Sequence, residues 1–158
     1  MNCHTLMIDD WLMIDEPDNY AGCKCKVQTL CNHQNDDGFY LTVYINGDKG
    51  FLNTEVFNED LRPIPLTEEI LEQNGFKKIN CIHTDNHFYR LTDTEVKEDY
   101  THNTWLIEAD KRDDCFVIDG EFQEDELLQG EINNYKIKYV HELQHIFRLL
   151  KLKKEIVL

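Results

Sequence analysis

The residues with the clearest chemical potential in this chain are His141, Glu142 and His145, which form the sequence H-E-x-x-H. On a helix, histidines at positions i and i+4 lie on one face and hold a zinc ion. The glutamate between them acts as general base on the metal-bound water. Apolar spacing predicts a helix from Val140 to Leu150. One hypothesis is therefore a zinc-dependent hydrolase with His141 and His145 as ligands and Glu142 as the base.

The surroundings of this motif favour a structural role instead. Apolar residues fill one arc of about 120° on the predicted helix, and His141 and His145 fall opposite the centre of that arc. We therefore expect both imidazoles to face solvent. A catalytic zinc also needs a third protein ligand, but the extended protease pattern would require glycine and histidine where Arg148 and Lys151 stand. We predict no catalytic, cofactor-binding or metal-ligating residue.

Two other groups of cysteine and histidine side chains could also hold a metal. The first is Cys23, Cys25, Cys31 and His33. On one continuous strand, Cys23 and Cys31 would lie about 26 Å apart at ~3.3 Å per residue, so they could not share a zinc ion. Small buried thiols explain these cysteines better. The second group is His83, Asp85 and His87, around a predicted hairpin turn, where polar residues are the ordinary choice.

Charge and hydropathy limit the classes of partner. The 158 residues are 41% hydrophobic and carry a formal charge of −15. Residues 136–158 hold six basic and two acidic groups, so the first 135 residues carry −19. Such a body repels phosphate, and we expect a protein partner without direct nucleic-acid binding. No apolar run approaches the ~20 residues that cross a bilayer, and no secretion signal is seen. We therefore predict no membrane association, a cytoplasmic location and free thiols.

The first 62 residues show the alternation that is typical of short β-strands. It is clearest from Phe39 to Ile45 and from Cys23 to Cys31, and Phe51–Phe57 follows a hairpin turn. Leu6–Ile8 is also predicted to be extended. About five short strands in this span predict a small β-barrel of the Src-homology type over residues 1–62.

Residues 63–76 form a joint with a short helix. Pro63 and Pro65 hold the chain extended. Thr67 is a suitable N-cap, and the acidic residues after it sit where the helix dipole favours negative charge. Gly75 fits the left-handed position that ends a helix.

Residues 77–158 are predicted to form an antiparallel sheet and a C-terminal helix. Together with the joint helix, this gives a sheet with two helices and an α+β fold. The predicted strands are 76–82, 87–91, 104–109, 115–119 and 132–138. We expect 92–103 to be an exposed acidic loop, and 155–158 to form a short final strand.

Two blocks resemble a known group of proteins. They are Pro63–Phe76, with the sequence P-I-P-L-T-E-E-I-L-E-Q-N-G-F, and Tyr139–Gln144, with the sequence Y-V-H-E-L-Q. This pairing resembles uncharacterised small proteins encoded in gut Bacteroidales genomes and their phages or mobile elements. The resemblance implies no activity and supplies no site residues.

Three functions are consistent with these observations. The leading hypothesis is a non-enzymatic protein-interaction or regulatory module. The alternatives are the zinc-dependent hydrolase with His141, Glu142 and His145, and an acidic DNA mimic that inhibits a nucleic-acid enzyme.

Overall fold

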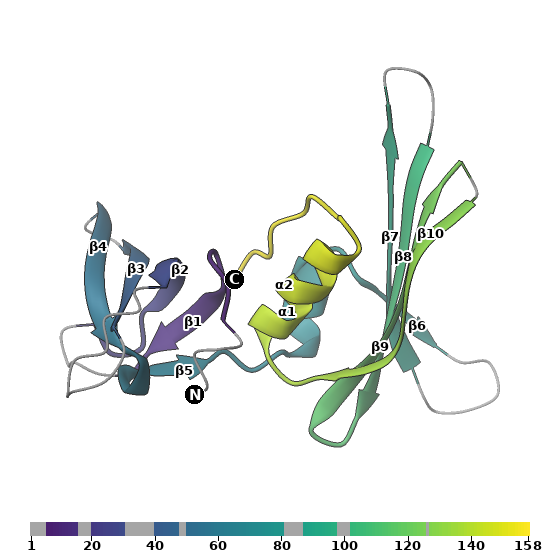
Figure 1. Cartoon of the computed structure of the whole chain (residues 1–158). Coiled ribbons are helices and arrows are strands. Elements are labelled where there is room, and N and C mark those ends of the chain that lie inside the picture. The colour runs from purple at the N-terminus through teal and green to yellow at the C-terminus, as the bar shows by residue number, and fades with distance from the viewer. Residues whose placement is uncertain are drawn as a thin grey trace. The chain divides into compact units, whose positions relative to one another are not determined.

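The computed structural model describes residues 6–15, 20–30, 40–47, 50–80, 87–97, 102–125 and 127–158. In these ranges strands predominate, in two antiparallel sheets with two short α-helices (Figure 1). The chain divides into two compact units, Met1–Pro65 with Tyr139–His141, and Leu66–Lys138 with Glu142–Leu158. The predicted α+β class is wrong, because this is a mostly β protein. None of the helices in the described ranges is long and apolar enough to cross a membrane.

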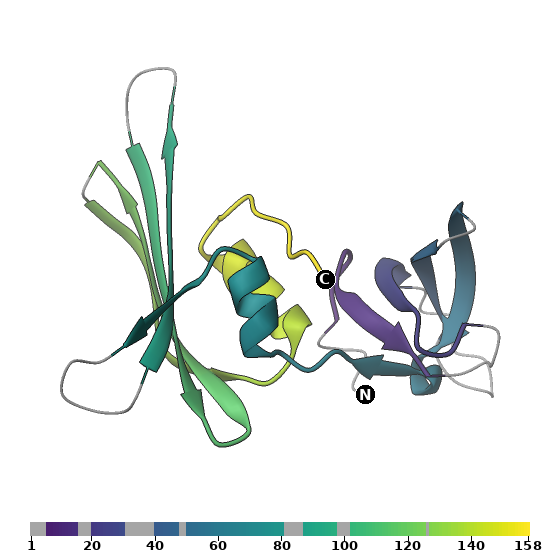
Figure 2. The same cartoon turned by 180° about the vertical axis from the view of Figure 1, so that it is seen from behind.

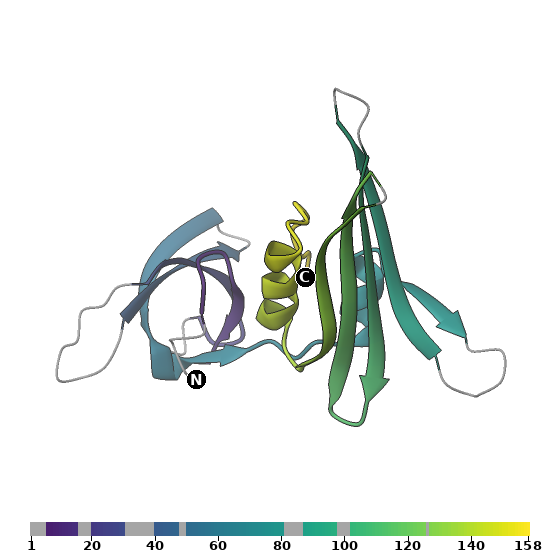
Figure 3. The same cartoon turned by 45° about the vertical axis from the view of Figure 1, so that its right-hand side comes forward.

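The first unit contains an open antiparallel sheet in the order β4-β3-β2-β1-β5. Its strands are Trp11–Ile14 (β1), Lys24–Leu30 (β2), Tyr40–Gly47 (β3), Gly50–Phe57 (β4) and the three-residue Leu61–Pro63 (β5). A 3₁₀ helix, Asn58–Asp60, connects β4 to β5. The sheet curls (Figure 3), but no pairing between β4 and β5 joins its edges in the part described. The small β-barrel of the Src-homology type predicted for residues 1–62 is therefore wrong, because no closed barrel is found in the described residues.

A row of directly opposed side chains forms the core of this sheet. Leu12 lies opposite Cys25, which lies opposite Ile45, and all three are buried. The predicted strand at Leu6–Ile8 is wrong, because the chain turns there: Asp9 has a φ of 67°. The buried Asp10 carboxylate accepts a hydrogen bond from the Met7 N–H at 2.8 Å, which stabilises this turn.

The second unit contains a larger antiparallel sheet in the order β10-β9-β8-β7-β6. Its strands are Lys77–Asn80 (β6), His87–Val96 (β7), His102–Arg112 (β8), Cys115–Glu124 (β9) and Leu127–Ile137 (β10). The helices Glu68–Gln73 (α1) and Val140–Leu149 (α2) lie side by side against one face (Figures 1 and 2). We call this the inner face and the opposite one the outer face.

Burial alternates along the central strands of this sheet, as expected when only one face is covered. On β8, the buried residues Trp105, Ile107 and Ala109 are separated by half-buried ones. Of the residues in the predicted apolar arc, Tyr139 is half-buried. The others are buried: Val140, Leu143, Ile146, Phe147 and Leu150. The helix predicted from Val140 is confirmed and ends at Leu149.

The predicted loop at 92–103 is wrong, because β7 extends to Val96 and β8 begins at His102. Thr94 pairs with Thr104, and Glu95 pairs with Asn103. Both faces are polar at this end, so no apolar alternation signals the strands. The strand predicted at 155–158 is also wrong: there the Asn74 side chain exchanges two hydrogen bonds with the backbone of Val157, at 2.8 and 2.9 Å.

The ends of α1 form as the sequence predicts. The Thr67 hydroxyl accepts a hydrogen bond from the Ile70 N–H at 3.3 Å, and Gly75 has a φ of 87°. The Phe76 N–H donates to the Leu71 carbonyl at 3.1 Å. This is the hydrogen bond of a Schellman motif.

Gly120 on β9 allows the end of α2 to approach the sheet. A Cβ at this position would lie 2.9 Å from Cδ1 of the buried Leu150. We expect Gly120→Ala to lower the free energy of unfolding by about 1 kcal/mol, because a methyl end can shift partway to relieve overpacking. Urea denaturation measures this change.

Gly130→Ala on β10 is the matched control, because a Cβ there meets no atom within 4 Å. Equal stability changes in the two variants would contradict the close approach of Leu150 to β9.

Candidate functional site

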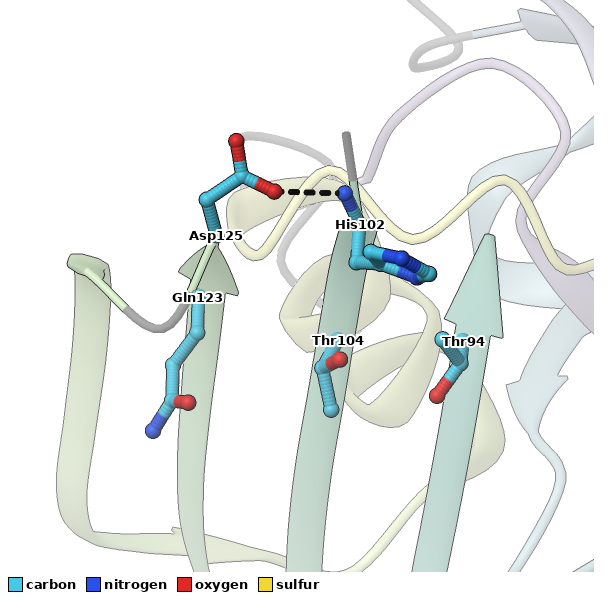
Figure 4. A pocket seen from close by; sticks show the side chains of 5 residues that line it. All are labelled: Thr94, His102, Thr104, Gln123 and Asp125. Carbon is cyan, nitrogen blue, oxygen red and sulfur yellow. Dashed lines mark hydrogen bonds between the residues drawn. The ribbon is translucent and has the colours of Figure 1, made fainter. Parts of the chain in front are cut away.

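The outer face carries a shallow hollow lined by polar side chains. Thr94, Thr104 and Gln123 lie opposite one another on β7, β8 and β9. They border a hollow of about 390 Å³ together with His102 and Asp125. Figure 4 shows the three side chains on neighbouring strands, with His102 and Asp125 at one end. The hollow therefore offers hydroxyl, amide and imidazole groups for hydrogen bonding.

His102 and Asp125 close this end of the sheet. The His102 N–H donates to Asp125 Oδ1 at 2.8 Å, and the Asp125 N–H donates to the His102 carbonyl at 2.9 Å. Asp125 has a φ of 48°, which an aspartate tolerates in a turn. The Asp125 carboxylate thus stabilises the turn. The hollow is therefore better suited to hydrogen bonding with a ligand than to acid–base catalysis.

Carboxylates face one another across neighbouring strands elsewhere on the outer face. Glu108 on β8 lies directly opposite Asp119 on β9, and Glu121 on β9 lies directly opposite Glu131 on β10. Arg90 Nε donates to Glu108 at 2.8 Å, which neutralises one of the four. Like charges directly opposite in a sheet cost roughly 0.2–1 kcal/mol per pair. The other three accept hydrogen bonds: Asp119 from the Asn134 N–H at 2.9 Å, Glu121 from Gln123 Nε2 at 3.0 Å and Glu131 from the Asn133 amide. The opposition of Glu121 to Glu131 nevertheless places two negative charges side by side.

Two ionisable groups with strongly shifted pKa values, Glu68 and Tyr89, lie together at the start of α1 on the inner face. The Glu68 carboxylate accepts hydrogen bonds from Lys111 and from the buried Tyr89 hydroxyl. Lys78 Nζ and His87 Nε2 lie 3.7 and 3.6 Å away. The hydrogen bond from Lys111, followed by that from Tyr89, lowers the pKa of Glu68 to about 2. Burial, followed by the contact with Glu68, raises the pKa of Tyr89.

Perturbed pKa values often mark functional sites, but the Glu68 contacts anchor α1 to β6, β7 and β8. The sequence predicts only a favourable interaction of Glu68 with the helix dipole. It gives no signal for the partners, because Lys111 is 43 residues away in the chain.

The structure corrects one expectation about the H-E-x-x-H segment. His141 is only 5% exposed, so the expectation that it faces solvent is wrong, while His145 is half-buried. The His141 ring stacks on Tyr139, with the ring centroids 5.9 Å apart. The Val140 N–H donates to the Ile64 carbonyl at 3.0 Å. The first turn of α2 therefore has a neighbour that a helical wheel does not represent.

Glu142 has a structural partner at the start of α2. Its Oε2 accepts a hydrogen bond from the Lys138 N–H at 2.7 Å, which resembles the reciprocal bond of a capping box. Over the described ranges, no group of three histidine, cysteine or acidic residues could hold a metal ion. His141 and His145 as zinc ligands therefore stay a hypothesis without a third ligand in the part described.

Of the cysteine candidates, Cys23 and Cys25 are described, and Cys25 is buried as predicted. Burial, with a smaller contribution from Cys23, raises the pKa of the Cys25 thiol to about 12. Cys25 is therefore a poor metal ligand or nucleophile at neutral pH. Cys31, His33, His83 and Asp85 lie outside the described residues.

Comparison of the chain with protein-family models, with curated proteins and with solved structures finds no match. The function has to be argued from the geometry of the two faces.

The Glu68 contacts predict a particular dependence of stability on pH. The folded state lowers the pKa of Glu68 from 4.5 to about 2. This carboxylate therefore stabilises the fold above pH ~4.5, and the contribution is lost as the pH falls towards 2. We expect Glu68→Gln to remove about 1 kcal/mol at pH 7, a discounted value because the group is partly exposed.

Chemical denaturation of Glu68→Gln should then show a shallower loss of stability between about pH 5 and pH 2. The control is Glu72→Gln, an exposed position on the same helix, which should keep the wild-type slope. If the stability of Glu68→Gln fell with pH as steeply as that of the wild type, the Glu68 contacts would contribute nothing to the free energy of unfolding.

The zinc hypothesis has a direct test in elemental analysis of the purified chain. We expect less than stoichiometric zinc, and we expect a chelator to leave the melting temperature unchanged, because no third ligand joins His141 and His145 among the described residues. Stoichiometric zinc that is lost in both His141→Ala and His145→Ala, but retained in His102→Ala, would establish the metal site.

Proposed function

We propose that this chain is a non-enzymatic protein-interaction module that binds a basic protein partner on the outer face of the second sheet. The observation that carries this proposal is the direct opposition of Glu121 to Glu131 and of Glu108 to Asp119. Arg90 already neutralises Glu108 in one pair. The charges of Glu121 and Glu131 repel each other, and cationic side chains of a partner placed between them would relieve this repulsion.

The neighbouring hollow adds specificity to this surface. Gln123 lies two residues from Glu121 on the same face of β9, so the hydroxyl and amide groups adjoin the acidic pairs. Charged groups attract a partner and fix its register, and hydrogen-bonding groups stabilise the correctly docked complex. A broad polar sheet face fits another protein surface better than a small molecule, which favours an enclosed pocket.

The charge of the whole chain supports the same class of partner. A formal charge of −15 accelerates association with a basic protein and makes it sensitive to salt. The bond between Glu142 and the Lys138 backbone also supports a non-enzymatic function, because it gives this glutamate a structural role.

The acidic pairs give less support to mimicry of DNA. Carboxylates on neighbouring strands lie on rows about 4.8 Å apart, whereas the phosphate rows that flank a DNA major groove are separated by a groove about 12 Å wide. A protein partner with interspersed cations is the better match to this pattern.

The test compares capture of proteins from a lysate of the source cells by the wild-type chain and by Glu121→Gln/Glu131→Gln. We expect one basic protein to bind the wild type, to dissociate as salt is raised, and to bind the variant at least tenfold less. The variant itself should be slightly more stable, by about 0.2–1 kcal/mol, because one repulsive pair is removed.

Glu59→Gln/Asp113→Asn is the matched control. It removes the same charge from exposed positions outside the acidic pairs and should retain the partner. Equal capture by the two double variants would refute docking on the outer face, since only overall charge would then matter.

A further inference from the structure

A groove of about 380 Å³ lies on the inner face, where the strands extend past the end of α2. Its lining comes from the ends of β7, β8 and β9, from β10 and from the segment after α2. It combines aromatic, amide, acidic and basic side chains: Glu95, Lys97, Asn103, Trp105, Phe122, Glu124, Gln129, Lys151 and Lys153. Its volume falls within the range of small-molecule sites.

Two aromatic rings form a rigid apolar part of this groove. Trp105 and Phe122 lie on paired strands, and their rings stack with centroids 5.2 Å apart and planes at 17°. The Trp105 Nε1–H donates to the Leu150 carbonyl at 2.6 Å, which fixes the indole. Both side chains are buried, at 3% and 7% exposed, so a planar ring that enters the groove meets a small preorganised apolar surface.

Asn103 brings a buried hydrogen-bond acceptor to the groove. The residue is 8% exposed, and its Nδ2 donates to Glu95 Oε2 at 3.4 Å, which sets the orientation of the amide. Its Oδ1 is buried and has no hydrogen-bond partner among the described residues. Most buried acceptors are satisfied, so this oxygen indicates a missing N–H or O–H donor.

Lys151 brings a further positive charge to the groove. Lys97 pairs with Glu124, and Lys153 Nζ lies 3.7 Å from Glu95. No such ion pair is found between Lys151 and the described residues. The groove thus has one more ammonium than carboxylate in a chain whose net charge is −15.

The backbone of Lys151 makes this lysine unexpected. It has a φ of 59° and follows α2 in a Schellman motif: its N–H donates to the Arg148 carbonyl at 3.0 Å, and the Leu152 N–H donates to the Phe147 carbonyl at 2.8 Å. Glycine is the usual residue there. Glycine at this position would avoid the strain of a positive φ. The presence of lysine here therefore indicates a role for its side chain other than folding.

We propose that this groove binds a small aromatic carboxylate that carries an N–H or O–H donor. The ring lies against Trp105 and Phe122, the donor bonds to Asn103 Oδ1, and the carboxylate pairs with Lys151. The groove and the proposed protein-docking surface lie on opposite faces of one sheet, so either can fail without the other.

Indole-3-acetate is a suitable probe, because it has a planar ring system of two fused rings, one N–H and one carboxylate. Titration of the full chain is followed by the indole N–H signal of Trp105 in two-dimensional NMR, with Trp11→Phe to assign it. We expect this signal to shift in a saturable way. Indole, which lacks the carboxylate, and 1-methylindole-3-acetate, which lacks the donor, should each bind at least tenfold more weakly.

Lys151→Gly separates binding from folding. We expect it to raise the melting temperature, because glycine relieves the left-handed backbone, and to weaken indole-3-acetate binding at least tenfold. Lys77→Gln, an exposed position on β6 outside the groove, should bind as the wild type does. Asn103→Leu should keep the fold and abolish the preference for indole-3-acetate over its 1-methyl analogue.

An unmoved Trp105 signal at the highest soluble concentration of indole-3-acetate would overturn the proposal. Equal losses of binding in Lys151→Gly and Lys77→Gln would also overturn it, because they would reduce the effect to net charge.

Discussion

The organisation of the second unit follows from a mismatch in length between its helices and its strands. The ten residues of α2 extend about 15 Å, whereas the eleven residues of β8 extend about 37 Å. Two short helices therefore cover only part of the inner face and none of the outer one. Apolar side chains gather where α2 packs, around Ile107 and Ile118. Beyond the end of α2, polar side chains join the aromatic residues Trp105 and Phe122 on the inner face, which carries a groove there.

The ionisable residues fall into two groups, those that hold the helices in place and those on surfaces that the helices leave uncovered. Glu68 holds α1 on the sheet through Tyr89 and Lys111, and Glu142 accepts a backbone hydrogen bond before α2. These two carboxylates stabilise the fold. By contrast, Glu121 and Glu131 repel each other on a face that no helix covers, and Lys151 strains the end of α2. Side chains that lower the stability of the free protein are therefore the better candidates for binding residues.

Local features of this fold could be predicted from sequence, and long-range ones could not. The cap at Thr67, the turn at Gly75 and the apolar face of α2 depend on neighbours within a few residues. The extensions of β7 and β8 lack apolar alternation, because Glu95 and Asn103 line a groove and not a core. Local spacing also gives no signal for the hydrogen bond from the Val140 N–H to the distant Ile64 carbonyl. The acidic pairs require the strand register, which sequence spacing does not give.

The most direct test of the outer face as the docking surface is carboxylate footprinting, in which activated carboxyl groups are labelled and the sites are read by mass spectrometry. In the free chain, Glu121 and Glu131 should label readily, as should the exposed controls Glu59 and Asp113. In the complex with a captured partner, the account predicts protection of Glu121 and Glu131 with the controls unchanged. Protection confined to the controls, or equal labelling of Glu121 and Glu131 in the free and bound chains, would contradict it.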